Sequence, residues 1–205
     1  MIAVELSAQP KDRTSLVTLP VAAGGVALLL ARPWLVSNGV GVPGLALLYL
    51  ELGAISLATP TLATGPRPHQ ASRDAGQGRA LPIVHLGIVL AIGLGAFVVA
   101  RLMAGPVAPL AVGASAVGLN LVAAVAEEAF FRKFLYGSLL PFGAAGAIVL
   151  SSVVFALVHV PLYGGAVFWV DLGAGLLLGW QRWASGSWAA PAATHAAANI
   201  LAVLR

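Results

Sequence analysis

Residues 81–103 read LPIVHLGIVLAIGLGAFVVARLM, with His85 and Arg101 as the only ionisable side chains in the run. A helix needs about 20 predominantly apolar residues to cross the hydrocarbon core of a bilayer. Further apolar stretches of similar length stand before and after this one. The run therefore predicts a membrane-spanning helix, and its neighbours predict several more.

The composition of all 205 residues extends this prediction to the whole chain. Hydrophobic residues make up 60% and charged residues 9%, whereas soluble domains carry about 25% charged residues. So few charges cannot cover a water-facing surface, and we expect most of the surface to face lipid. The net charge of +4 is spread over single basic residues, without the patch typical of nucleic-acid binding. The absence of cysteine excludes disulfides, thiolate metal sites and a cysteine nucleophile.

We predict an all-α fold, a polytopic transmembrane bundle of about seven spans. Residues 1–105 hold the N-terminal spans, to which the sequence assigns no role, and they include a polar loop at 60–80. Residues 106–205 hold the chemistry described below. The predicted spans, the first of which closes at Arg32-Pro33, are 15–31, 42–59, 81–103, 109–141, 142–160, 161–180 and 187–204.

The basic residues of the loops predict the orientation in the membrane, because cytoplasmic loops carry an excess of Lys and Arg. If successive spans cross the membrane in opposite directions, seven of these basic residues lie on the side of the N-terminus and three lie on the other side. This distribution favours a cytoplasmic N-terminus, and the Gly- and Ala-rich composition favours a bacterial inner membrane. The seven are Lys11, Arg13, Arg67, Arg73, Arg79, Lys133 and Arg182, and the three are Arg32, Arg101 and Arg205.

The densest group of ionisable residues inside a predicted span is Glu127-Glu128-Ala-Phe-Phe-Arg132. Such residues are costly in a membrane and indicate function. On a helix, Glu128 and Arg132 share a face and can pair, while Glu127 is rotated by about 100° toward another neighbour. One carboxylate is then held by the arginine and the other stays available. The competing interpretation, a purely structural ion pair, leaves Glu127 unexplained.

Three further polar residues lie within later spans. His159 ends the run Phe155-Ala-Leu-Val-His, before Pro161, which is expected to stop that helix. His195 and Asn199 are spaced i, i+4 and share a face. At 1.5 Å per residue, Glu127, His195 and Asn199 fall roughly 14–20 Å from one end of their spans, near the bilayer centre, while His159 counts deeper at roughly 26 Å. This convergence predicts one shared site.

The chemistry of this set favours attack by water on an acyl carbon. A carboxylate and an imidazole can bind and deprotonate a water, and an imidazole and a carboxamide can donate hydrogen bonds to an oxyanion. The same side chains could hold a zinc ion, although the chain has no H-E-x-x-H motif. We expect no cofactor, with a divalent metal such as zinc as the alternative.

The three motifs, in this order on three apolar segments, resemble the CPBP family of intramembrane peptidases. The family includes CAAX prenyl endopeptidases and bacteriocin-processing or immunity proteins, and the resemblance covers about residues 109–204. It implies that Glu127 and His159 activate water and that His195 and Asn199 form the oxyanion hole. Glu128 and Arg132 would orient the site. Where a glycine often follows the motif arginine in this family, this chain has a lysine at position 133.

The resemblance implies an endopeptidase that acts on a membrane-associated protein or peptide. Leader peptides, C-terminal sorting anchors and CAAX-like tails are all open as substrates, and a bacterial source favours the first two. The rival hypothesis is a non-catalytic membrane protein, such as an immunity factor or a proton-coupled transporter, that uses the carboxylates as a relay. Asp171 lies mid-span in Phe-Trp-Val-Asp-Leu and is a further candidate for the site. Gly175-Leu-Leu-Leu-Gly179 is typical of a helix-packing face.

Overall fold

The computed structural model describes residues 12–61, 83–103 and 113–203, which form helices joined by short turns. No strand occurs in these ranges, so the predicted all-α class is confirmed. The predicted polar loop lies almost entirely outside the described residues. The helices are α1 Asp12–Leu30, α2 Arg32–Ser37, α3 Val42–Ala58, α5 Ile83–Met103, α6 Ala114–Glu128, the π-helix η1 Ala129–Leu135, α7 Tyr136–Leu139, the 3₁₀ turn η2 Leu140–Phe142, α8 Gly143–Tyr163, α9 Val167–Ser185 and α10 Ala189–Val203.

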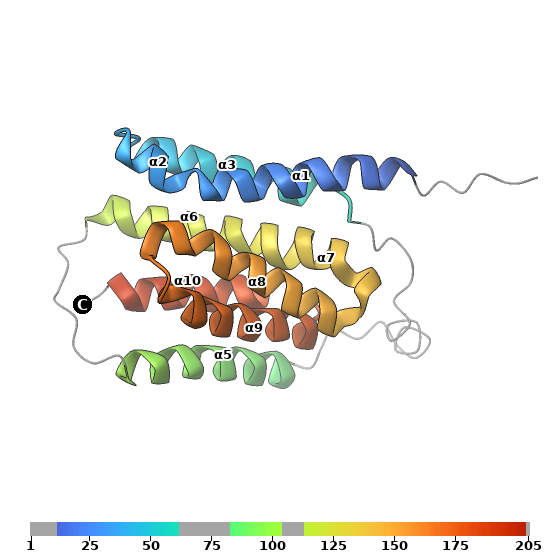
Figure 1. Ribbon diagram of the computed structural model, residues 1–205. Coiled ribbons are helices and arrows are strands. Elements are labelled where there is room, and N and C mark those ends of the chain that lie inside the picture. Colours follow the sequence, from blue (N-terminus) through green and yellow to red (C-terminus); the bar gives the residue numbers. More distant parts are fainter. Residues whose placement is uncertain (1–11, 62–82, 104–112, 204–205) are drawn as a thin grey trace, which may run out of the picture.

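The helices lie roughly parallel or antiparallel to one another in layers (Figure 1). Helices α1, α2 and α3 form the layer along one side, and α5 lies along the opposite side. Between them, α6 packs against both α3 and α10, and α8 packs against α9. The helices that carry the three motifs, α6, α8 and α10, therefore all lie in the interior of the bundle.

A sharp reversal separates α7 from α8, so that the two helices run side by side. Pro141 lies in the turn η2, and Gly143 follows with φ at +81°. Only glycine adopts this left-handed region without steric cost. The continuous helical stretch Ala114–Tyr163 is thus folded back on itself, which allows motifs from its two halves to meet.

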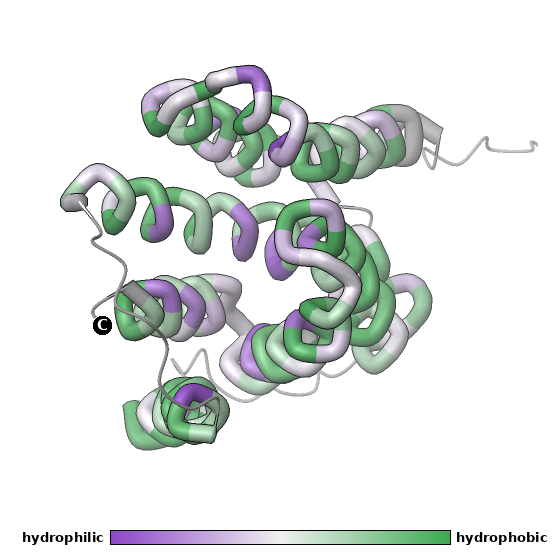
Figure 2. Tube along the Cα trace, turned by 60° about the vertical axis from the view of Figure 1, so that its left-hand side comes forward, coloured by the Kyte–Doolittle hydropathy of each residue, from purple (hydrophilic) through white to green (hydrophobic). Residues whose placement is uncertain are grey.

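Three helical stretches are long and apolar enough to cross a membrane, namely Val17–Ser37, Ile83–Met103 and Ala114–Tyr163. Figure 2 shows that hydrophobic positions dominate the helices. On α5, Ile83, Val84 and Leu102 are 89%, 72% and 76% exposed. Contiguous apolar surface of this kind is not left to water in soluble proteins. The chain is an integral membrane protein, although the length and apolarity of the remaining helices do not confirm all seven predicted spans.

One predicted helix boundary is confirmed and another is wrong. Helix α1 ends at Leu30, beside the predicted end at Ala31, although Arg32 then begins α2, is buried, and the apolar stretch continues to Ser37. Proline at the second position of a new helix costs no hydrogen bond, since that N–H has no partner inside the helix. Pro161 lies inside the last turn of α8 and does not stop it. The helix ends at Gly164, whose φ of +89° is left-handed.

The predicted packing face on α9 is confirmed. A Cβ on Gly175 would lie 2.9 Å from Cβ of Ser152, and one on Gly179 would lie 3.0 Å from a methyl of Ile148. The two glycines therefore let the backbones of α8 and α9 approach closely. This approach brings α9, including Asp171, next to the motif residues of α8.

Candidate active site

Glu127 and Glu128 are the last two residues of α6 and are 4% and 0% exposed. The π-helix η1 follows at once, and its Phe130, Phe131 and Phe134 are completely buried in the apolar core. Short π-helical segments inside α-helices are frequent at functional sites. The two carboxylates face different partners, as the predicted 100° rotation requires, and each forms its own polar cluster.

The Glu128 cluster is fully buried and matches the predicted pairing. Oε2 of Glu128 accepts a hydrogen bond from Nε of Arg132 at 3.2 Å. Oε1 lies 3.0 Å from Nδ1 of His195 on α10. Arg132 also donates from Nη1 to Oγ of Ser151 on α8, at 3.1 Å. Glu128 and Arg132 therefore tie α6, α8 and α10 together around the imidazole of His195.

The Glu127 cluster brings the first and second motifs together. Oε2 of Glu127 lies 3.7 Å from Nε2 of His159. Its other oxygen, Oε1, accepts a hydrogen bond from Nη1 of Arg32 at 2.8 Å. Glu127 is thus held on one side and faces a histidine with the other, and Arg132 does not occupy it.

The contacts of His159 define which of its ring nitrogens carries hydrogen. Nδ1 lies 2.7 Å from the carbonyl oxygen of Phe155. A carbonyl only accepts hydrogen bonds, so Nδ1 must donate, and Nε2 of the neutral ring is then an acceptor. When the ring is neutral, Glu127 Oε2 and His159 Nε2 are two hydrogen-bond acceptors, and they lie 3.7 Å apart. A water molecule that donates one hydrogen to each satisfies both groups.

Asp171 on α9 approaches the same histidine from another side. Its Oδ2 lies 3.8 Å from Nδ1 of His159, and this oxygen is buried without a hydrogen-bond partner in the described structure. The sequence left open whether Asp171 touches the site, and the structure places it there. His159 consequently lies between two carboxylates, those of Glu127 and Asp171.

The two residues of the third motif, His195 and Asn199, contact different groups on α6. Because Nδ1 of His195 donates to Glu128, its Nε2 remains for another partner. Nδ2 of Asn199 donates one hydrogen to the carbonyl of Asn120 at 3.2 Å, two helical turns before Glu127 on α6. The carboxamide has a second N–H hydrogen. The ring of Phe155 contacts both histidines, with centroid distances of 4.6 Å to His159 and 5.9 Å to His195.

The sequence did not indicate Arg32 and Tyr49 as site residues. Arg32 is 3% exposed and donates from Nη1 to the hydroxyl of Tyr49 on α3, at 2.8 Å, as well as to Glu127. A lone arginine followed by proline, between two apolar segments, resembles a charge at the membrane interface. The sequence holds one sign that Arg32 is buried: the apolar residues continue beyond Arg32 as far as Val36.

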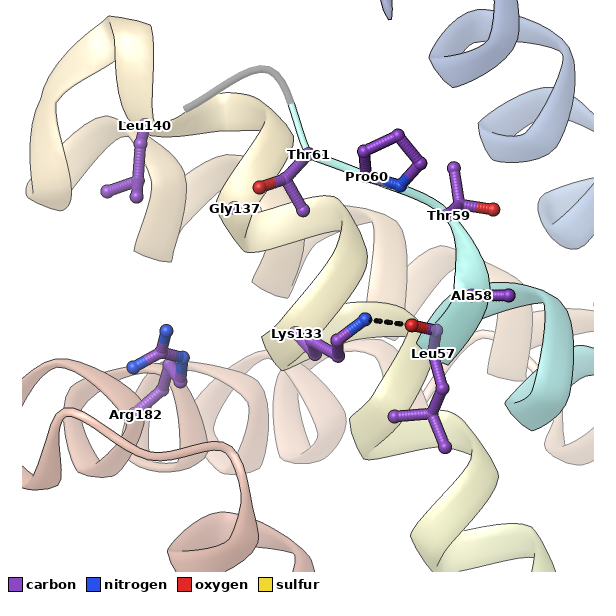
Figure 3. A pocket seen from close by; sticks show the side chains of 9 residues that line it. All are labelled: Leu57, Ala58, Thr59, Pro60, Thr61, Lys133, Gly137, Leu140 and Arg182. Atoms are coloured by element: carbon purple, nitrogen blue, oxygen red, sulfur yellow. Dashed lines mark hydrogen bonds between the residues drawn. The ribbon is translucent and has the colours of Figure 1, made fainter. Parts of the chain in front are cut away.

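Lys133, which follows the motif arginine, lies outside both clusters. Its Nζ donates to the carbonyls of Ser56, at 3.1 Å, and Leu57, at the C-terminal end of α3 (Figure 3). A cavity of about 340 Å³ opens beside it. None of the six predicted site residues lines this cavity, which is bordered by Leu57, Ala58, Thr59, Pro60, Thr61, Lys133, Gly137, Leu140 and Arg182. A cation at this helix end satisfies carbonyls that lack partners within α3.

Among the described residues, no three His, Cys, Asp or Glu side chains are grouped as ligands for a metal ion.

Comparison with known proteins agrees with the geometry. Residues 109–201 match the model of a protease family, described as type II CAAX prenyl endopeptidase Rce1-like. The matched segment contains all three motifs and confirms the resemblance predicted from them. Over this segment, which is less than half of the chain, the sequence is similar to that protease family. No curated protein and no solved structure gives a significant match.

Proposed function

We propose that this protein is an intramembrane endopeptidase of the glutamic type, in which Glu127 and His159 activate a water molecule. The observation that carries the proposal is the approach of Glu127 Oε2 to His159 Nε2, at 3.7 Å. Both side chains are buried, and they come from separate helices in a protein whose surface is apolar.

The reaction follows from these groups. The bound water donates a proton to Oε2 of Glu127, and its oxygen forms a bond to the carbonyl carbon of the peptide as the carbonyl electron pair moves onto oxygen. When the tetrahedral intermediate collapses, the C–N bond breaks and the proton held by Glu127 passes to the leaving nitrogen. His159 orients the water through Nε2, with Nδ1 fixed on the Phe155 carbonyl.

We assign the oxyanion to His195 and Asn199. Nε2 of His195 donates only when the ring carries hydrogen on both nitrogens, because Nδ1 already donates to Glu128. The adjacent Glu128 carboxylate favours that charged form. Asn199 supplies its second N–H hydrogen. Glu128 and Arg132 orient the site by holding His195 on α10 against α6 and α8.

The proposed substrate is a membrane-associated protein or peptide. The family takes its name from CAAX prenyl substrates, whereas a bacterial inner membrane favours a leader peptide or a C-terminal sorting anchor. We further propose that the chain crosses the membrane about seven times with a cytoplasmic N-terminus. Removing the buried Arg32 and Arg182 from the loop charges leaves six basic residues against two, which supports the same orientation.

The reaction as written needs no cofactor. Were His195 a zinc ligand instead, its replacement by alanine would remove bound metal together with activity. Measuring the metal content of the purified wild type and of His195→Ala separates the two types of peptidase.

A second candidate function is a proton relay in a non-catalytic membrane protein. The observation in its favour is the row of three titratable groups, Glu127, His159 and Asp171, with successive separations of 3.7 and 3.8 Å. A relay of this kind moves protons but breaks no peptide bond, so an assay of cleavage distinguishes it from the peptidase.

The test uses membranes that contain wild type, Glu127→Ala or Glu51→Ala. The last is the matched control, because Glu51 is an exposed glutamate of α3 outside both clusters. Membranes are incubated with three internally quenched peptides: a farnesylated CAAX peptide, a membrane-anchored leader and a C-terminal sorting anchor. We expect wild type and Glu51→Ala to cleave at least one of them at a defined bond, and Glu127→Ala to cleave none. Equal cleavage by Glu127→Ala would contradict the proposal.

A further inference from the structure

Arg32 joins four helices through a single side chain. Nε donates to the carbonyl of Leu29 at the end of α1, at 2.8 Å, and Nη2 donates to the carbonyl of Val158 on α8, at 3.1 Å. Nη1 donates to Tyr49 on α3 and to Glu127 on α6, both at 2.8 Å. Four of the five N–H hydrogens of the guanidinium are thus used. A side chain so fully satisfied and buried has one position only.

We propose that Arg32 is a positioning residue of the active site, which fixes the Glu127 carboxylate so that Oε2 alone is offered to water and His159. Oε1 is held at 2.8 Å by the guanidinium, while Oε2 faces the imidazole at 3.7 Å. Because Arg32 also binds the carbonyl of Val158, the residue before His159, the same group sets the position of both partners. This inference rests on the proposed function for its mechanistic meaning.

The charge of Arg32 has a second consequence. A buried carboxylate without a cation takes up a proton, since an isolated charge in a medium of low dielectric is costly. Arg32 is the only arginine or lysine that contacts Glu127 in the described part of the chain. The other titratable groups that surround Glu127 are Tyr49 on α3, Arg132 on η1, Tyr163 and His159 on α8, Asp171 on α9 and His195 on α10. Arg32 is therefore the cation that balances the carboxylate of Glu127, the group that accepts a proton from water in the proposed reaction.

The position of Arg32 in the chain gives residues 1–105 a role. The match to the protease family begins at residue 109, yet the guanidinium that holds Glu127 comes from the α1–α2 junction and is supported by α3. The layer formed by α1, α2 and α3 (Figure 1) thus completes the active site that the C-terminal half carries. The C-terminal half alone would lack the partner of its Glu127.

The first experiment measures the ionisation of Glu127 without any substrate. Infrared spectra of the purified full-length protein with ¹³C-labelled glutamate, in nanodiscs at neutral pH, are recorded for wild type, Arg32→Met and Arg32→Lys. The signal of Glu127 is identified by its loss in Glu127→Gln. We expect an ionised carboxylate in wild type and in Arg32→Lys, and a protonated carboxyl in Arg32→Met. An ionised Glu127 in Arg32→Met would overturn the proposal.

The second experiment measures cleavage of whichever quenched peptide the wild type accepts. We expect Arg32→Met to lower kcat by about 10²-fold or more and Arg32→Lys by about tenfold, because a displaced base costs turnover. KM should stay within about twofold, since Arg32 does not touch the peptide. Tyr49→Phe should change kcat by less than about threefold, because the bond to Glu127 remains. Arg101→Met is the matched control, with the same substitution at the end of α5, and should retain wild-type kcat.

The two experiments separate the inference from the proposed function. If no peptide is cleaved by the wild type, the proposed function fails, while the infrared spectra still decide whether Arg32 keeps Glu127 ionised. If Arg32→Met is not produced, Arg32→Lys decides: a lowered kcat at normal abundance supports positioning by the full guanidinium, and wild-type kcat contradicts it.

Discussion

Nδ1 of His195 lies 3.0 Å from Oε1 of Glu128, across the interface between α10 and α6. Glu128 is completely buried and also binds Arg132. One carboxylate therefore balances a buried guanidinium and accepts a hydrogen bond from Nδ1 of the imidazole that we propose for the oxyanion hole. We therefore expect Glu128 to act mainly by holding Arg132 and His195 in place, whereas Glu127 is proposed to act on water.

Replacing Glu128 by alanine should lower the free energy of unfolding strongly. It leaves Arg132 fully buried without its carboxylate, and breaking a buried ion pair in this way costs about 3–5 kcal/mol. Unfolding of the purified protein in mixed detergent micelles measures the change. Glu51→Ala on the exposed side of α3 is the control and should stay within about 0.5 kcal/mol of wild type. Equal stability of the two variants would show that the Glu128–Arg132 pair is not required for the fold.

Replacing Asn199 by alanine should lower turnover by about 10²–10³-fold, the usual effect of removing one oxyanion donor. Substrate affinity should change little, because such a donor acts in the transition state. Steady-state kinetics on a cleaved peptide, with the exposed Asn38→Ala as control, give both quantities. If Asn199 served only to join α10 to α6 through the Asn120 carbonyl, the variant would lose about 1 kcal/mol of stability and keep its specific activity.

Replacing Gly175 by valine should destabilise the protein by about 1–3 kcal/mol, because the new side chain overpacks the contact with Ser152. Gly173 lies in the same helix, is exposed, and has nothing within 4 Å of a Cβ. Gly173→Val therefore makes the same chemical change without the clash and should be close to wild type. The difference in unfolding free energy between the two variants measures the close approach of α8 and α9, and no difference would argue against it.

Helical spacing predicted much of the site because its contacts are local or lie on shared helix faces. The i, i+4 pairing of Glu128 with Arg132 and the different direction of Glu127 both follow from 100° per residue, and the structure contains both. The meeting of Glu127 with His159 was predicted from depth in the membrane. The count along the helices placed His159 deeper than Glu127, whereas the two side chains lie 3.7 Å apart.

The contribution of Arg32 could not be predicted in the same way. It lies 95 residues before Glu127 in the chain, and no periodicity connects positions so far apart. Its burial depends on how the α1–α3 layer packs on α6 and α8, which is a tertiary property. The π-helix η1 was also not predicted, because apolar residues such as Phe130 and Phe131 fit an α-helix equally well.

The central claim is that Glu127 and His159 act on one water molecule. Its most direct test compares the turnover of Glu127→Gln, His159→Gln and the double variant on the same peptide. Each single change should lower kcat by about 10²–10⁴-fold, as loss of general acid–base catalysis does. The double variant should be no slower than the slower single one, because residues that act as a unit are not additive. Turnover near wild type in either single variant, or a double variant slowed by the product of the two effects, would contradict the claim.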